Sequence, residues 1–114
     1  MHDELRPDEA LMLAYRDGDA AAFEALYARH RSRLYRYLAH QCGDARLAEE
    51  LYQDIWLRVI NARADYEVSA RFTTWLYRIA HHRLIDHYRR NAREQLRQWE
   101  IGRASCRERV YVLV

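Results

Sequence analysis

Residues 43–62 read GDARLAEELYQDIWLRVINA and residues 70–99 read ARFTTWLYRIAHHRLIDHYRRNAREQLRQW, and these two stretches decide the fold. In both, apolar residues recur at intervals of three and four, the period of an amphipathic helix. Their charges differ, because residues 44–67 hold six acids and three arginines, whereas residues 68–97 hold two acids, seven arginines and three histidines. The first helix therefore suits a basic protein partner, and the second suits phosphate.

Proline, glycine and aspartate divide the chain into four predicted helices. Pro7 opens a first helix over about residues 8–17, because proline is tolerated in a first turn. The acids Asp8 and Glu9 complement the helix dipole there. Glycine commonly ends a helix, and aspartate or serine commonly caps the next one. The predicted stops are Gly18 and Gly43, and the predicted caps are Asp19, Asp44 and Ser69.

The expected fold class is all-α, a compact four-helix domain around one core. No stretch alternates apolar and polar residues as a strand would, and no internal repeat is visible. The core is predicted to consist mainly of Phe23, Leu26, Leu34, Leu38, Leu51, Ile55, Trp75, Leu76 and Ile79.

Length and composition limit the class of protein. A chain of 114 residues, half of them hydrophobic, is expected to form one ordered domain. All of its 19 basic residues are arginine, which pairs with carboxylate and phosphate through two parallel hydrogen bonds. Cys42 and Cys106 have neither disulfide-framework nor metal-site spacing. Without a signal peptide or a long apolar run, we expect a cytoplasmic protein that does not insert into a membrane.

An acidic patch is predicted on the helix that follows Gly43. Its members, Glu49, Glu50, Gln53 and Asp54, lie within about a turn and a half of helix. Their side chains can accept hydrogen bonds from arginines of a partner helix, and Gln53 adds a donor. The alternative is a solvated helix face without a partner.

The last helix and the loop before it have the composition of a single-strand binding surface. Unstacked bases bind to aromatic faces, and their phosphates bind to cations. The aromatic candidates are Tyr66, Phe72 and Trp75, and the cationic ones are Arg71, Arg78, Arg83, Arg89, Arg90 and Arg93. Phe72 and Trp75 stand three residues apart and are followed by Leu76 and Ile79, which favours the core for both, so Tyr66 and the arginines are the stronger candidates.

The histidines admit a metal hypothesis, because His82 and Asp86 are four residues apart on one helical face. His81 and His87 are near them, but no further ligand stands at motif spacing. We therefore expect no metal and no cofactor. An enzyme is not expected either, because the chain has no glycine-rich phosphate loop and no nucleophile motif. A helical adaptor domain without DNA binding and an unrelated DNA-binding bundle are the remaining alternatives.

Three segments in order resemble the second conserved region of sigma-70 type RNA polymerase sigma factors, most closely the extracytoplasmic-function (ECF) group. They are GDAAAFEALYARHRSRLYRYL (18–38), AEELYQDIWLRV (48–59) and FTTWLYRIAHHRLIDHYRR (72–90). The resemblance implies a helical domain that docks on the clamp coiled coil of the polymerase β′ subunit. It also implies capture and melting of the promoter minus-ten element on the non-template strand, and an anti-sigma factor as a further partner.

The resemblance assigns the acidic patch to polymerase and the last helix, with its loop, to DNA. Family members flip a minus-ten base into the loop that here runs from Tyr66 to Phe72, and they read bases near His81, His82 and Asp86. Three positions depart from the family pattern. Asp usually stands at Glu50, a smaller residue at Tyr52, and an Arg-Asn pair at His81 and His82.

The expected organisation is an N-terminal extension over residues 1–7, the region 2 domain over 8–97 and a tail over 98–114. From about Glu100 the sequence EIGRASCRERV loses helical period, and its reverse translation looks like read-through into a sequencing adapter. A natural C-terminus is the alternative. Because family members continue into a helix-turn-helix domain that binds the minus-thirty-five element, the resemblance implies that this chain is a fragment.

Overall fold

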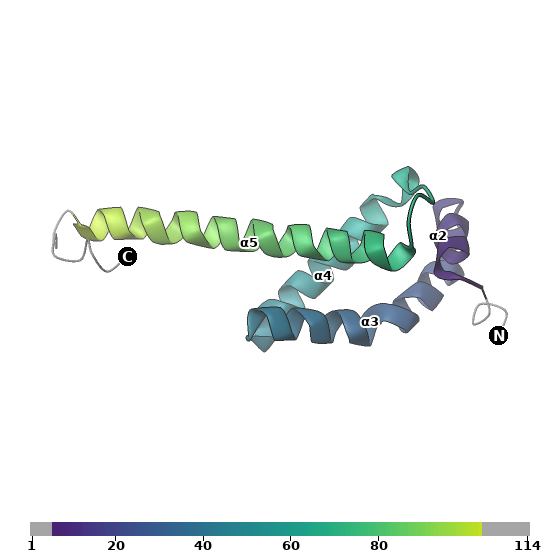
Figure 1. Ribbon diagram of the computed structural model, residues 1–114, viewed down its shortest axis with the longest axis horizontal. Coiled ribbons are helices and arrows are strands. Elements are labelled where there is room, and N and C mark those ends of the chain that lie inside the picture. The colour runs from purple at the N-terminus through teal and green to yellow at the C-terminus, as the bar shows by residue number, and fades with distance from the viewer. Residues whose placement is uncertain (1–5, 104–114) are drawn as a thin grey trace. The chain divides into compact units, whose positions relative to one another are not determined.

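The computed structural model describes residues 6–103, and these form four α-helices and one 3-10 turn without any strand. The helices are α2 (Asp8–Arg16), α3 (Ala20–Cys42), α4 (Ala45–Asn61) and α5 (Phe72–Arg103), and η1 (Arg63–Asp65) follows α4 (Figure 1). The predicted all-helical fold with four helices is confirmed. No helix of the described residues is both long and apolar enough to cross a membrane.

The ends of α3 and the start of α4 follow the predicted local signals. The Asp19 carboxylate accepts hydrogen bonds from the backbone N–H groups two and three residues on, at 3.1 and 3.3 Å. The Asp44 carboxylate does the same for α4, at 3.0 and 3.4 Å. Gly43 ends α3 with φ of 67°, a left-handed conformation that costs glycine little. Both predicted aspartate caps are confirmed.

The start of α5 differs from the prediction, because Ser69 is not its cap. The helix begins at Phe72, and the Glu9 carboxylate of α2 accepts a hydrogen bond from the Phe72 backbone N–H at 2.5 Å. An acceptor from a distant helix thus replaces the expected local side chain. The end of α5 also differs, since the helix continues through Gly102 to Arg103. Residues 104–114, with Cys106, lie outside the described residues.

The core contains most of the predicted residues. Leu26, Leu34, Leu38, Leu51, Ile55 and Leu76 are all fully buried. Phe23, Trp75 and Ile79 are half-buried, so they do not belong to the buried part of the core. Helix α2 adds Leu11 and Met12, both 0% exposed, and the segment around the last loop adds Tyr66 and Phe72. The first helix therefore packs as an integral part of the domain.

The chain divides into two compact units, with the boundary inside α5 between His81 and His82. The first unit holds α2, α3, α4, η1 and the first turns of α5. Within it, the Asp8 carboxylate joins α2 to α3, because it pairs with Arg29 Nη1 and with His30 Nε2, both at 2.9 Å. The rings of Tyr37 and Tyr77, 5.2 Å apart, join α3 to the start of α5.

Candidate functional site

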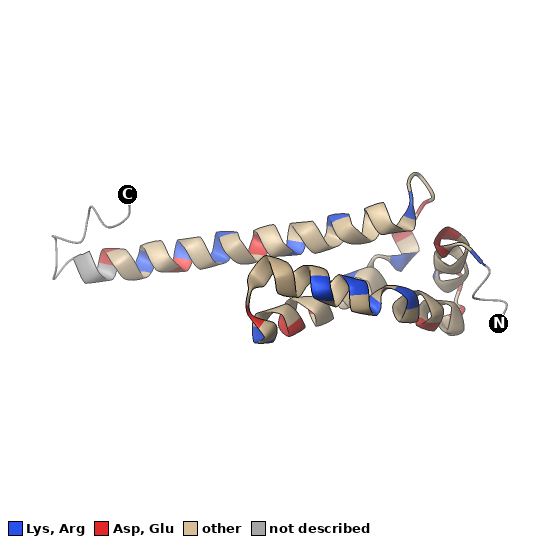
Figure 2. Cartoon of the chain, turned by 60° about the horizontal axis from the view of Figure 1, so that its bottom comes forward, with Lys and Arg blue, Asp and Glu red and all other residues tan. Residues whose placement is uncertain are grey.

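Basic residues recur along α5, and Figure 2 colours their positions on the ribbon blue. The predicted arginines at positions 71, 78, 89, 90 and 93 are exposed. Arg83 is not, since only 8% of it is exposed, so it is poorly placed to meet the backbone of a bound strand. Exposed guanidinium groups keep their hydration until a phosphate replaces it, and each contact then releases a counterion.

The second unit carries its own cluster of charges on α5. Arg90, Arg93 and Arg97 line one groove together with Glu94, and Glu94 pairs with Arg97. His82 is exposed, whereas Asp86 and His87 are half-buried. Among residues 6–103, no three His, Cys, Asp or Glu side chains are grouped closely enough to hold a metal ion.

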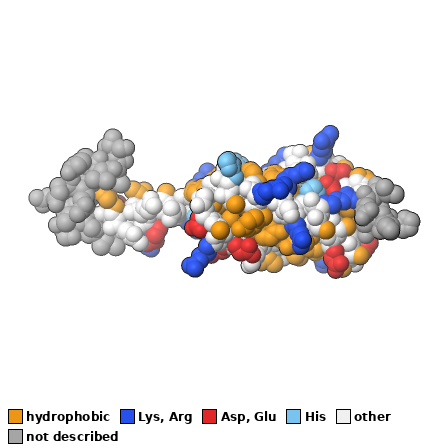
Figure 3. All heavy atoms as spheres, turned by 90° about the horizontal axis from the view of Figure 1, so that it is seen from below, with side chains coloured by type: hydrophobic (Ala, Val, Ile, Leu, Met, Phe, Trp, Pro, Cys, Tyr) orange, Lys and Arg blue, Asp and Glu red, His pale blue; other side chains and the backbone are white. Residues whose placement is uncertain are grey.

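Helix α3 carries exposed arginines that the sequence analysis did not assign to any site. Arg31, Arg33 and Arg36 are exposed on α3, and Figure 3 shows a face on which arginines alternate with hydrophobic side chains. Arg33 and Arg36 lower the pKa of Tyr77 by their charge, although burial is the larger effect and leaves that pKa above its ordinary value. Within the first unit, exposed arginines are therefore present on α3 as well as at Arg71 and Arg78.

The loop before α5 begins and ends with buried aromatic rings. Tyr66 is 1% exposed and Phe72 is 0% exposed, and the half-buried Trp75 contacts both. The centroid of the Trp75 ring lies 5.0 Å from that of Tyr66 and 5.8 Å from that of Phe72. The expectation that Tyr66 offers a free ring face to a base is therefore wrong for this structure, because neighbouring rings cover it. The rings of Phe72 and Trp75 pack against Tyr66 and so stabilise the ends of the loop.

Between these rings, residues 67–71 are exposed, and Val68 is 55% exposed. The loop thus offers a short open segment whose two ends are held in the core. The Tyr66 hydroxyl is buried without a hydrogen-bond partner among the described residues. Burial raises the pKa of Tyr66, and the nearby carboxylates of Glu9 and Asp8 raise it further. Tyr66 is therefore a neutral, structural residue.

The structure brings the four members of the acidic patch together on α4. Glu49, Glu50 and Gln53 are exposed, and Asp54 is half-buried. Gln53 Nε2 donates a hydrogen bond to Glu49 Oε2 at 3.0 Å, and Asp54 Oδ2 pairs with Arg58 Nε at 3.5 Å. These bonds orient the side chains, and they do not exclude a partner, since a carboxylate can accept several hydrogen bonds at once.

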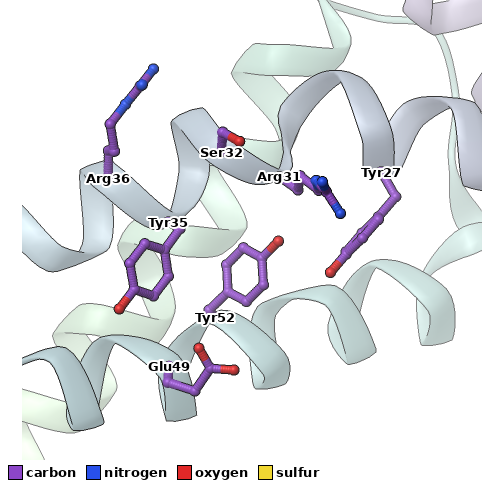
Figure 4. A pocket seen from close by; sticks show the side chains of 7 residues that line it. All are labelled: Tyr27, Arg31, Ser32, Tyr35, Arg36, Glu49 and Tyr52. Atoms are coloured by element: carbon purple, nitrogen blue, oxygen red, sulfur yellow. The ribbon is translucent and has the colours of Figure 1, made fainter.

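An aromatic groove borders the acidic patch along the seam of α3 and α4. It has a volume of about 530 Å³ and is shown in Figure 4; its lining residues are Tyr27, Arg31, Ser32, Tyr35, Arg36, Glu49 and Tyr52. In that view Tyr52 of α4 lies between Tyr27 and Tyr35 of α3, and Arg36 points away from α4. A second hollow continues it along α4, lined by Tyr27, Tyr52, Gln53, Trp56, Leu57 and Ile60.

The sequence analysis missed this groove. Of its tyrosines, Tyr52 alone was named above, as a departure from a family pattern. The available signal was the spacing of Tyr27 and Tyr35, eight residues apart on one helical face, and of Tyr52 and Trp56, four apart. Burial raises the pKa of Tyr52 above its ordinary value, and the adjacent Tyr27 adds to this. Tyr52 is thus an uncharged phenol at neutral pH, and tyrosine side chains such as those of the groove can both pack and hydrogen-bond.

Comparison with known proteins gives one family. Residues 26–94 match the family description Sigma-70 region 2. RNA polymerase sigma factor CarQ of Myxococcus xanthus is 41% identical over 86 residues, which cover 68% of this chain and 49% of CarQ. ECF RNA polymerase sigma factor SigK of Mycobacterium sp. (strain KMS) is 34% identical over 98 residues, 85% of this chain and 51% of SigK. The chain spans about half the length of the curated relatives it matches.

Proposed function

The chain belongs to the sigma-70 family through its region 2 domain, in the ECF group, and we propose that it acts in transcription initiation by binding RNA polymerase core and promoter DNA. It would dock on the β′ clamp coiled coil and then recognise and melt the minus-ten element. It would act in the cytoplasm under an anti-sigma factor. The observation that carries this proposal is the pair of differently charged surfaces on α4 and α5.

The acidic patch supports the docking role. Its exposed carboxylates suit the arginines or lysines of a partner helix, because ionised pairs form the stronger hydrogen bonds. The aromatic groove beside it adds a hydrophobic component, and aromatic residues commonly supply most of the binding energy at protein interfaces. A charged rim next to an aromatic hollow is what a specific protein interface requires.

The exposed loop and the arginines of α5 support the DNA role. The loop of residues 67–71 can admit a base; Arg71 is its last residue, and Arg78 is exposed on the first part of α5. In the second unit, Arg89, Arg90 and Arg93 are exposed and can contact phosphates of single-stranded DNA. His81, His82 and Asp86 carry donors and acceptors suited to base edges. We propose no catalytic role, because sigma factors supply no catalytic group to the polymerase reaction.

The docking role is tested by reversing charge in the acidic patch. The double change Glu50→Arg and Asp54→Arg should abolish capture of purified bacterial core polymerase by the immobilised chain, because it places cations where the partner's cations must bind. The control Glu24→Arg makes the same kind of change at an exposed position of α3 and should leave capture intact.

Circular dichroism of each variant checks that the helices remain. Folded double-variant protein that still captures polymerase as well as the wild type would contradict the docking proposal. Polymerase capture without any binding to non-template strand would instead favour the adaptor domain, in which the arginines of α5 are only solvated.

A further inference from the structure

Both ends of the exposed loop 67–71 receive a polar contact from α2. The Glu9 carboxylate accepts from the Phe72 backbone N–H at 2.5 Å, and this partner is 63 residues away in the sequence. Arg16 Nη1 donates to the Tyr66 backbone carbonyl at 3.3 Å, across 50 residues. One short helix therefore contacts the residue before the loop and the residue after it.

Helix α2 is itself held firmly in the first unit. Leu11 and Met12 are 0% exposed, and the Asp8 carboxylate pairs with Arg29 and His30 of α3. The His30 ring lies 5.4 Å from the Phe72 ring, so the same α3 residue also packs against the end of the loop. A helix that is buried and ion-paired in this way can act as a fixed support rather than a mobile arm.

We propose that α2 is a positioning element for the loop, in which Glu9 and Arg16 set the loop geometry and thereby the bases that it accepts. This inference rests on the proposed function. Glu9 also provides a negative charge at the N-terminus of α5, which stabilises the first helical turn. Without it, the Phe72 N–H would lose its acceptor, and the loop end would no longer be held. The arginines of α5 would keep their phosphate contacts, so base preference would fall while general affinity stayed.

Whether Glu9 holds the loop end at Phe72 can be tested on the chain without polymerase or DNA, by amide hydrogen exchange. In Glu9→Ala we expect the Phe72 amide to exchange about fivefold faster, the factor that loss of a helix cap commonly produces. Glu9→Gln keeps an acceptor oxygen and should restore most of the protection. Glu24→Ala removes an exposed acid from α3 and should change nothing at Phe72. Unchanged exchange in Glu9→Ala would overturn the proposal.

The effect on recognition is tested with each variant bound to core polymerase, on non-template oligonucleotides that carry single-base changes in the minus-ten element. In Glu9→Ala and Arg16→Ala the ratio of affinities for the preferred and the changed sequences should fall by about tenfold, the discrimination that one base-reading contact commonly supplies. The salt dependence should stay as in the wild type. The control Arg46→Ala, at an exposed position of α4, should keep both the affinity ratio and the salt dependence of the wild type.

Two results would separate the possible failures. Equal weakening on all oligonucleotides, with the ratio kept, would overturn the positioning role and leave the proposed function intact. A wild-type complex that binds no non-template strand would overturn the proposed function, and the recognition role of α2 with it. Hydrogen exchange at Phe72 would still report in that case whether Glu9 supports the loop.

Discussion

At the scale of single residues, Tyr66 changes most between its expected and its observed role. Its ring is 1% exposed, and its hydroxyl has no hydrogen-bond partner among the described residues. A buried hydroxyl without a partner destabilises a fold, whereas the ring that carries it stabilises the fold through packing. The two contributions can be separated by substitution.

Tyr66→Phe should therefore raise the free energy of unfolding by about 1 kcal/mol, the cost of an unsatisfied buried polar group. Urea titration at neutral pH measures this. Tyr66→Ala, which also removes the ring, should instead cost ~3–5 kcal/mol. A Tyr66→Phe variant that is less stable than the wild type would show that the hydroxyl has a partner in solution.

The same substitution predicts a pH effect. In the folded state the pKa of Tyr66 is raised above its ordinary value of 10.0. The stability linked to keeping this hydroxyl protonated is therefore present below about pH 10 and is lost as the pH rises through the folded pKa. Wild-type stability should fall more steeply than that of Tyr66→Phe above pH 10. Parallel alkaline unfolding curves would contradict the raised pKa.

Leu51 lies on α4, the helix that carries the acidic patch, and is 0% exposed. Leu51→Ala should reduce the free energy of unfolding by ~2–5 kcal/mol, because a buried cavity remains. Leu57, on the same helix, is 55% exposed, and Leu57→Ala should change stability by no more than about 0.5 kcal/mol. Thermal unfolding followed by circular dichroism compares the two, and equal losses would contradict the core described here.

At the scale of elements, α5 combines two kinds of residue along its length. Its first turn carries Phe72 and Leu76, both 0% exposed, and its later turns carry exposed arginines. The early part therefore stabilises the first unit, whereas the later part is available to a ligand. Arginine at exposed helix positions contributes little to stability, since its charge is hydrated in both the folded and the unfolded chain.

The element-scale prediction concerns salt. Arg89→Ala and Arg90→Ala should each weaken binding to all non-template oligonucleotides and make the logarithmic salt slope shallower by about 0.7, the value for one phosphate contact on a single strand. Arg46→Ala on α4 is the matched control. Titrations at several salt concentrations measure the slope, and a slope that neither α5 variant changes would mean that these arginines are only solvated.

At the scale of the whole molecule, the two proposed surfaces lie on different helices and use opposite charges. Changes in one should leave the other intact, because the ion pair of the acidic patch lies within α4, between Asp54 and Arg58, and that of the α5 arginines lies within α5, between Glu94 and Arg97. The charge-reversed acidic patch should abolish polymerase capture and preserve salt-dependent binding of the chain to single-stranded DNA.

The reverse should hold for the double variant Arg89→Ala and Arg90→Ala, which should capture polymerase normally and bind DNA weakly. Measuring both activities on both variants tests this. Loss of both activities in a variant that remains helical would show that the two surfaces depend on each other.

The sequence by itself determined the helices, most of their limits and the charge of each surface. Asp19, Gly43 and Asp44 act within one turn of their own helix, so their effect can be predicted from neighbouring residues alone. The acidic patch follows in the same way, because helical periodicity places side chains three and four residues apart on one face.

Only the tertiary structure decided which residues support the loop and which line the groove. Glu9 caps α5 although it stands 63 residues before Phe72 in the sequence, and no local spacing predicts a contact between residues so far apart. Tyr66 was a candidate for base stacking, but it is buried because Phe72 and Trp75 pack against it. The groove of Tyr27, Tyr35 and Tyr52 likewise exists only where α3 and α4 meet. Capping residues and helical spacing act between residues about one turn apart, whereas burial depends on which helices and loops pack together.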